Sequence, residues 1–151
     1  MEYRLRTFEE LTAGELYQLL QLRSEVFVVE QQCIYLDADG KDYKALHLLG
    51  YEGERLTAYT RLFAPGDYCE EASIGRVAVS PSRRGEGLGR EIMKASLEAV
   101  EKRFGRVDIC LSAQAYLCRF YEEMGFQAEG PEYLEDGIPH IRMVLWKKDR
   151  D

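Results

Sequence analysis

Hydrophobic and polar positions alternate in the first part of the chain with the period of β-strands. Residues 3–8 (YRLRTF) alternate in this way and predict a first strand. Residues 45–51 and 55–63 are two mostly apolar stretches separated by Glu-Gly-Glu, a pattern typical of an antiparallel hairpin. Residues 72–79 (ASIGRVAV) predict one more strand.

Between the first strand and the hairpin, apolar positions follow helical spacing instead. Thr12 and Glu15 form the T-x-x-E pattern of a capping box, which predicts a helix that begins there. Leucines and other large side chains then recur three and four residues apart as far as Phe27, so we expect a well-buried helix. Residues 31–44 (QQCIYLDADGKDYK) break the pattern and predict a loop or a short irregular helix.

The second half of the chain predicts two more helices and three more strands. The helices are expected at 86–104 and 115–124, and the strands at 107–113, 126–129 and 139–147. The resulting order, β-α-β-β-β-α-β-α-β-β, indicates an α/β fold with a mixed sheet and helices on both faces. The β-α-β passages around residues 85 and 115 favour parallel neighbouring strands with right-handed crossovers.

Composition is that of one folded domain spanning residues 1–151. The apolar share is 46%, and no apolar run approaches the roughly 18 residues of a membrane span. The N-terminal MEYRLRTFEE is polar and acidic, unlike a secretory signal, so we expect a cytoplasmic protein without a membrane partner. The four cysteines form no C-x-x-C pair and no histidine lies at ligand spacing, which predicts reduced thiols and no metal.

The net charge of −7 argues against a nucleic-acid partner, because such binding depends on neutralising phosphates. The arginines are nevertheless clustered, and four of them lie between residues 76 and 90. An acidic protein with one basic corner suits an anionic ligand at that corner and a cationic substrate elsewhere.

Three alternate glycines, Gly85, Gly87 and Gly89, lie where a predicted strand passes into a predicted helix. Glycine permits positive φ and close approach of a ligand to the backbone, and a helix N-terminus offers unpaired N–H groups, so this junction predicts a phosphate site. A P-loop is excluded because Gly89 is followed by Arg90 and Glu91 rather than Lys-Ser/Thr. The spacing G-x-G-x-G also differs from the dinucleotide fingerprint.

The stretch from Arg84 to Gly89 has the spacing R-x-x-G-x-G, follows VAVSP at 77–81, and is joined by FYEEMGF at 120–126. With these two motifs the chain resembles the GNAT family of acyl-CoA-dependent N-acetyltransferases, and the order of the other elements agrees with that fold. FVVEQ, LSAQAYL and YLEDGIPHI resemble the bacterial ElaA-like branch of the family. The resemblance implies acetyl-CoA as co-substrate, a small-molecule or peptide amine as acceptor, and direct transfer in a ternary complex. A homodimer is also compatible with it, because members of the family often dimerise.

The resemblance also implies roles for individual residues. The strand backbone at Val77–Val79 would hold pantetheine and the thioester carbonyl, while Gln114 would bind the cofactor or face solvent at a helix start. The expected cofactor-binding set is Val77, Ala78, Val79, Arg84, Gly85, Glu86, Gly87, Leu88, Gly89, Arg90 and Gln114. Within this set, the amides from Gly85 to Arg90 would hold the diphosphate.

Tyr121 corresponds to the general acid that protonates the leaving thiolate, although a core aromatic residue is the alternative. The general base is open. Many relatives have a glutamate on the strand at 107–113, where this chain has Asp108, so the candidates are Glu30, His47 and His140. Other functions also stay open: an acyl-CoA sensor without turnover, a transferase of other acyl groups, and a cysteine-relay enzyme.

Overall fold

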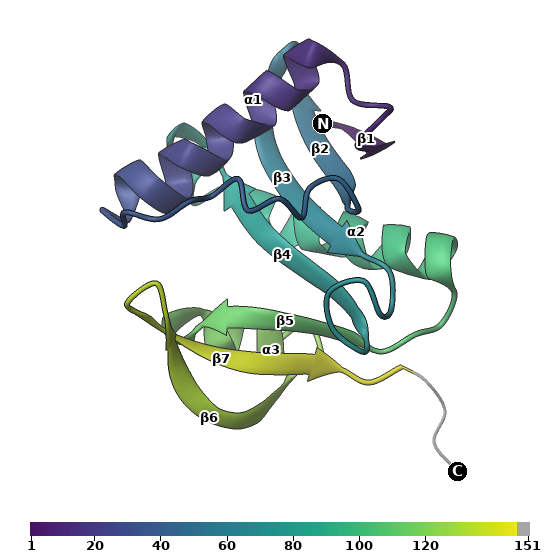
Figure 1. The fold of residues 1–151 in the computed structure, drawn as a ribbon, viewed down its shortest axis with the longest axis vertical. Coiled ribbons are helices and arrows are strands. Elements are labelled where there is room, and N and C mark those ends of the chain that lie inside the picture. The colour runs from purple at the N-terminus through teal and green to yellow at the C-terminus, as the bar shows by residue number, and fades with distance from the viewer. Residues whose placement is uncertain (148–151) are drawn as a thin grey trace.

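The computed structural model describes residues 1–147 (Figure 1). The first half contains β1 (Glu2–Thr7), α1 (Ala13–Arg23), η1 (Ser24–Glu30), β2 (Leu46–Glu52), β3 (Arg55–Phe63) and β4 (Ala72–Val79). The second half contains η2 (Pro81–Arg83), α2 (Leu88–Phe104), β5 (Ile109–Gln114), η3 (Ala115–Leu117), α3 (Cys118–Glu122), β6 (Gln127–Glu135) and β7 (Ile138–Leu145). The predicted order of helices and strands is confirmed.

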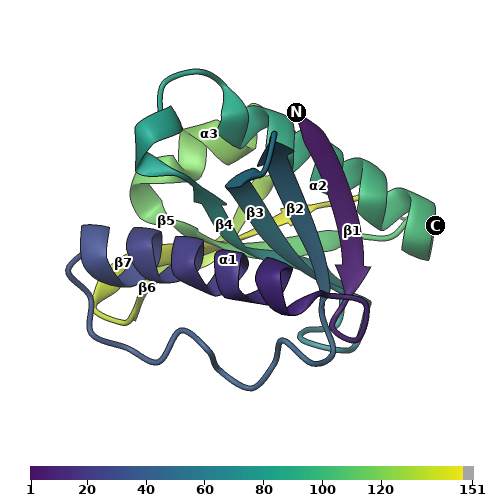
Figure 2. The same cartoon turned by 90° about the horizontal axis from the view of Figure 1, so that it is seen from above.

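Within residues 1–147, seven strands form one mixed sheet in the order β1-β2-β3-β4-β5-β7-β6. Only β4 and β5 are parallel neighbours, and all other adjacent pairs are antiparallel. Figure 2 shows α1 along one face of the sheet and α2 and α3 on the other. The α/β class, the β2–β3 hairpin and the parallel passage through α2 are therefore as predicted.

The passage through α3 differs from the prediction that its flanking strands are neighbours. β7 lies between β5 and β6 and is antiparallel to both. The two-residue turn Asp136–Gly137, in which both φ angles are positive (53° and 77°), joins β6 and β7 as a tight hairpin, and β7 is the strand of this hairpin that pairs with β5. This hairpin also extends β6 to Glu135, well beyond the strand expected at 126–129.

The first helix begins as predicted and then changes geometry. Thr12 Oγ1 accepts a hydrogen bond from the Glu15 amide, and the Glu15 carboxylate accepts one from the Thr12 amide, both at 3.0 Å. The α-helical part ends at Arg23, and the wider π-helical turns of η1 continue to Glu30. Such turns are rare and frequently occur at functional sites.

A buried ionic network holds the long segment between η1 and β2 against the sheet. The fully buried Arg23 donates hydrogen bonds to Asp37 (2.8 Å) and Asp42 (2.7 Å). Arg61 on β3 pairs with the same Asp42 (3.0 Å) and with Asp39 (2.9 Å). Burial alone would raise the pKa of Asp42, but its two arginine partners outweigh burial and hold that pKa below its usual range.

Two of the four cysteines are not free thiols in this structure, contrary to the sequence-based prediction. Cys69 and Cys110 are joined as a disulfide, whereas Cys33 and Cys118 are free. The two half-cystines are 41 residues apart in the sequence, so no local spacing marks them as a pair. As far as the chain is described, no helix is long and apolar enough to cross a membrane.

We expect Asp42→Ala to lower the free energy of unfolding by about 3–5 kcal/mol, because it leaves two buried guanidinium groups short of a partner. The matched control is Glu2→Ala, which breaks the exposed Arg4–Glu2 pair and should cost less than about 1 kcal/mol. Urea unfolding measures both. The carboxylate stabilises the fold above the unfolded-state pKa near ~4, so the difference between Asp42→Ala and wild type should shrink as the pH falls below that value. Equal losses in the two variants would contradict this account.

Candidate functional site

The sheet opens between β4 and β5. These strands pair at only two positions, Ala72 with Ile109 and Ser73 with Cys110. Beyond this point the two strands diverge toward their C-terminal ends, as Figure 1 shows. A cavity of about 620 Å³ lies at the opening and is lined by both strands, the loop before α2, α3, η1 and the β6–β7 turn.

An irregularity in β4 accompanies this divergence. The register between β3 and β4 shifts so that two residues, Arg76 and Val77, lie opposite the single Thr60. Such a bulge bends its strand and increases its twist. Arg76 has a φ of 50°, uncommon for a residue with a side chain, and its Nε lies 2.8 Å from Asp37 Oδ1. The ionic network therefore extends to the edge of the cavity.

The loop before α2 has the backbone geometry of an anion site. Gly85 and Gly87 have φ angles of 81° and 82°, which only glycine adopts without strain. Gly87 caps α2, and no side chain in the described chain accepts from the first amides of this helix. The first helical hydrogen bond runs from the Glu91 amide to Gly87 O, so the preceding amides are available to a ligand.

The arginines of this loop have carboxylate partners. Arg84 donates two hydrogen bonds to Glu30, at 2.9 and 2.7 Å, and one to Val79 O at 3.1 Å. Arg83 pairs with Glu86 and with a carboxylate of β2. Carboxylates thus largely neutralise the charge of the predicted basic corner in this structure. The backbone amides are the groups there that remain free for an anion.

Tyr121 lies at the α3 wall of the cavity and is 5% exposed. Its ring packs edge-on against Phe120 and Phe126, with centroids 5.1 and 6.1 Å away. Burial raises the pKa of Tyr121 to about 12, and Tyr116 adds to this effect. The phenol therefore keeps its proton at neutral pH and can donate a hydrogen bond. It belongs to the core and also lines the cavity, so the two alternatives for this residue are not exclusive.

His140 lies on the face of the sheet opposite to Tyr121, next to acidic groups. Its Nδ1 is 2.7 Å from Ile138 O. A carbonyl can only accept, so Nδ1 carries a hydrogen and Nε2 is the proton-accepting nitrogen of the neutral ring. Nε2 lies 3.4 Å from Glu135 Oε2. The ring also stacks with that of Tyr133 at an interplanar angle of 26°, and the Tyr133 hydroxyl hydrogen-bonds Ser112.

Most of the predicted site residues line this one cavity. They are Glu30, Val77, Val79, Arg84, Gly85, Gly87, Leu88, Gly89, Gln114, Tyr121 and His140. Of the other predicted residues, Ala78 is buried in the core under α1, and Glu86 and Arg90 are paired with Arg83 and Glu123.

His47 does not take part in the site. It is fully buried, with Nδ1 2.6 Å from the Tyr59 hydroxyl and Nε2 2.9 Å from Asp42 O. Burial lowers its pKa, so it is a neutral structural residue. Asp108 lies just before β5 and accepts a hydrogen bond from the Lys147 amide at 2.9 Å.

Ser112 and Glu135 of the cavity wall are not among the residues expected from the sequence, and Arg76 is expected there only as part of the basic corner. Strand alternation places Ser112 on the same face as Gln114, and this signal was available from the sequence. Glu135 approaches His140 only through the β6–β7 register, and Arg76 reaches the cavity only because β4 bulges. The positions of Glu135 and Arg76 in the cavity wall do not follow from the local sequence pattern.

The sequence model of the acetyltransferase (GNAT) domain matches residues 20–147. The chain belongs to the GNAT family. It is 45% identical to Escherichia coli protein ElaA over 137 residues, which are 89% of this chain and 90% of the relative. The crystal structure of E. coli ElaA superposes with a TM-score of 0.89 and covers 95% of this chain and 99% of that one.

A Pseudomonas aeruginosa acyl-CoA N-acyltransferase of known structure is also similar, with 43% identity and a TM-score of 0.91. The match covers 95% of this chain and 97% of that one. An aminoglycoside 6'-N-acetyltransferase crystallised with coenzyme A shares the fold at 16% identity, with a TM-score of 0.72 over 98% and 99% of the two chains. The GNAT-like architecture and the resemblance to ElaA are therefore confirmed.

Proposed function

We propose that this protein is an acyl-CoA-dependent N-acyltransferase that transfers the acetyl group of acetyl-CoA to a primary amine. The observation that carries the proposal is the continuous cavity from the head of α2 to His140, through the opening between β4 and β5. One end of it offers glycine amides to a diphosphate, and the other offers a proton-accepting group to an amine. This arrangement supports direct transfer with both substrates bound.

The cofactor-binding assignments rest on backbone groups. The amides from Gly85 to Arg90 hold the diphosphate, where the positive end of the α2 dipole favours anions. The β4 edge at Val77–Val79 faces β5 without a paired strand, so its N–H and C=O groups bind the amides of pantetheine and stabilise the carbonyl oxygen as it gains charge. Gln114 lies at the cavity wall and binds the same arm.

Two different residues serve the two proton transfers of the reaction, one at the incoming amine and one at the leaving sulfur. As the amine nitrogen bonds to the carbonyl carbon, His140 Nε2 accepts the amine proton and Glu135 stabilises the resulting imidazolium. The carbon–sulfur bond then breaks, and the Tyr121 hydroxyl donates to the leaving sulfur as general acid. Glu30 is the weaker candidate for the base because both of its oxygens accept hydrogen bonds from Arg84.

Acidic groups near the proposed base favour an acceptor amine that carries a positive charge in solution. Glu135 and Asp136 line the end of the cavity at the β6–β7 turn. A lysine-like amine has a pKa near ~10 and arrives mostly protonated at neutral pH, so carboxylates there would attract it. A base is then needed to release the nucleophile.

Gly87→Val should weaken acetyl-CoA binding by about 100-fold. A β-branched residue is strained at a φ of 82°, and its side chain enters the space in front of the helix amides. Gly53→Val is the matched control, because Gly53 also has positive φ (63°) but lies in the β2–β3 turn. Calorimetry measures both affinities. Normal binding by Gly87→Val would refute the loop assignment.

Tyr121→Phe should lower kcat by about 100-fold and change acetyl-CoA affinity by less than about threefold. The variant keeps the aromatic packing and removes only the donor. Steady-state rates and a binding isotherm separate the two effects. Parallel losses in rate and affinity would show that Tyr121 is a packing residue alone.

His140→Gln should lower kcat/KM by about 100-fold or more and change acetyl-CoA affinity by less than about threefold, because the variant lacks the proton-accepting ring nitrogen. Glu30→Gln, the control at the other candidate base, should lose less than about tenfold in kcat/KM. Steady-state rates and a binding isotherm decide between them. The opposite outcome would transfer the role of base to Glu30.

A panel of amines assayed for acetyl-CoA-dependent thiol release tests the function itself. Release with at least one cationic amine is the expected result. Tight acetyl-CoA binding without release for any amine would favour an acyl-CoA sensor. Faster release from a longer or an acidic acyl-CoA would replace acetyl with that group.

A further inference from the structure

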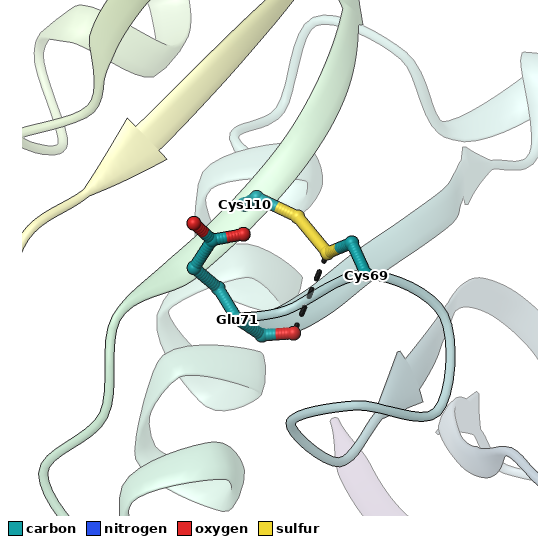
Figure 3. Close-up of side chains that lie close together, drawn as sticks. All are labelled: Cys69, Glu71 and Cys110. Carbon is teal, nitrogen blue, oxygen red and sulfur yellow. Dashed lines mark hydrogen bonds between the residues drawn. A yellow bond between two sulfur atoms is a disulfide. The ribbon is translucent and has the colours of Figure 1, made fainter.

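Cys69, Glu71 and Cys110 form a cluster of metal-binding side chains away from the cavity (Figure 3). Cys69 and Glu71 precede β4, and Cys110 lies on β5. The two sulfur atoms and a carboxylate oxygen all lie within 4.8 Å of one another. Within residues 1–147, none of the three lines the cavity, so the cluster is separate from the proposed active site.

The backbone spacing is wide for a pair of bonded cysteines. The Cα atoms of Cys69 and Cys110 are 7.8 Å apart. Ordinary disulfides place their Cα atoms about 4.4–6.8 Å apart. Two thiolates that share one zinc ion each have a metal–sulfur bond of about 2.3 Å, which permits a wider spacing than a direct sulfur–sulfur bond. The spacing therefore suits a bridged pair of reduced cysteines.

Glu71 supplies a third potential metal ligand, because one of its carboxylate oxygens has no other partner. Its Oε2 accepts a hydrogen bond from Arg142 at 2.8 Å, and its Oε1 is buried without a hydrogen-bond partner in the described structure. A buried unpaired carboxylate oxygen is costly unless something satisfies it. A bound cation would satisfy this oxygen while Arg142 holds the other one.

We propose that, in the reduced protein, Cys69, Cys110 and Glu71 bind one Zn²⁺ ion. Thiolates select zinc over calcium or magnesium, and three protein ligands leave the fourth tetrahedral position to water. The charges also balance, because the divalent ion and the Arg142 guanidinium together offset two thiolates and one carboxylate. The disulfide is the oxidised form of the same pair and cannot hold the ion.

The position of the cluster gives the ion a structural role. Cys110 pairs with Ser73 at the last ladder position before β4 and β5 diverge. An ion bound there fastens the segment before β4 to β5 and holds the closed end of the opening in place. Binding should therefore stabilise the fold without adding a group to the cavity.

Cobalt titration of the reduced, metal-free protein under anaerobic conditions tests the site. The expected result is one Co²⁺ per chain with a thiolate-to-cobalt charge-transfer band, displaced by one equivalent of Zn²⁺. Cys69→Ser and Cys110→Ser should each weaken binding by at least about 100-fold, and Glu71→Gln by at least about tenfold. Cys33→Ser and Cys118→Ser, the controls at the two free cysteines, should bind as the wild type does.

Alkylation of the reduced wild-type protein gives a second measurement that needs no variant to fold. Zn²⁺ should slow the labelling of Cys69 and Cys110 at least about tenfold and leave Cys33 and Cys118 unchanged, as peptide mapping would show. The absence of a charge-transfer band, binding that survives Cys69→Ser, or protection of the control cysteines alone would overturn the proposal. Each of these outcomes is independent of acetyl-CoA, so the site can fail without the proposed acyltransferase function failing.

Discussion

The separation of β4 from β5 after two paired residues is the constraint on which the rest of the structure depends. Two parallel central strands would normally pair along their length, because unpaired backbone groups inside a protein are costly. Here the pairing stops at Ser73 and Cys110, and a bulge at Arg76 bends β4. The exposed strand edge has the donors and acceptors that an amide-containing ligand needs. The fold thus tolerates an incomplete sheet where a ligand can complete it.

The buried arginine–aspartate network maintains this opening from one side. Asp37 pairs with both Arg23 and Arg76, so one carboxylate connects α1 to the bulge of β4. Buried ion pairs gain little net stability over apolar packing, but each fixes the geometry of the groups it joins. The same network positions the segment after η1, which contributes Cys33 and Tyr35 to the cavity wall. The network therefore fixes the positions of its neighbours at the place where the sheet is least regular.

Local signals in the sequence were sufficient for the elements and for the glycine loop. The capping box at Thr12, the turn between β2 and β3 and the alternate glycines before α2 each act over a few residues, so their structure follows from their own chemistry. The position of β7 between β5 and β6 does not follow from local chemistry, because it depends on which strand of the sheet the β6–β7 hairpin joins. The Glu30–Arg84 pair and the Cys69–Cys110 contact likewise join residues 54 and 41 positions apart. Such contacts form only once the sheet order is set.

In the mechanism we propose, the two faces of the sheet keep the acid and the base from competing for the same proton. Leu111 and Ala113 on β5 belong to the core that contains Tyr121, whereas Ser112 and Gln114 alternate to the face of His140. Tyr121 therefore reaches the opening from the side of α3, and His140 reaches it from the side of the acidic turn. A cysteine relay fits this arrangement poorly, since the free thiol in the cavity wall, that of Cys33, donates to Asp136 O. If the proposed roles of Tyr121 and His140 hold, the incoming amine and the leaving sulfur meet separate faces, which favours direct transfer between them.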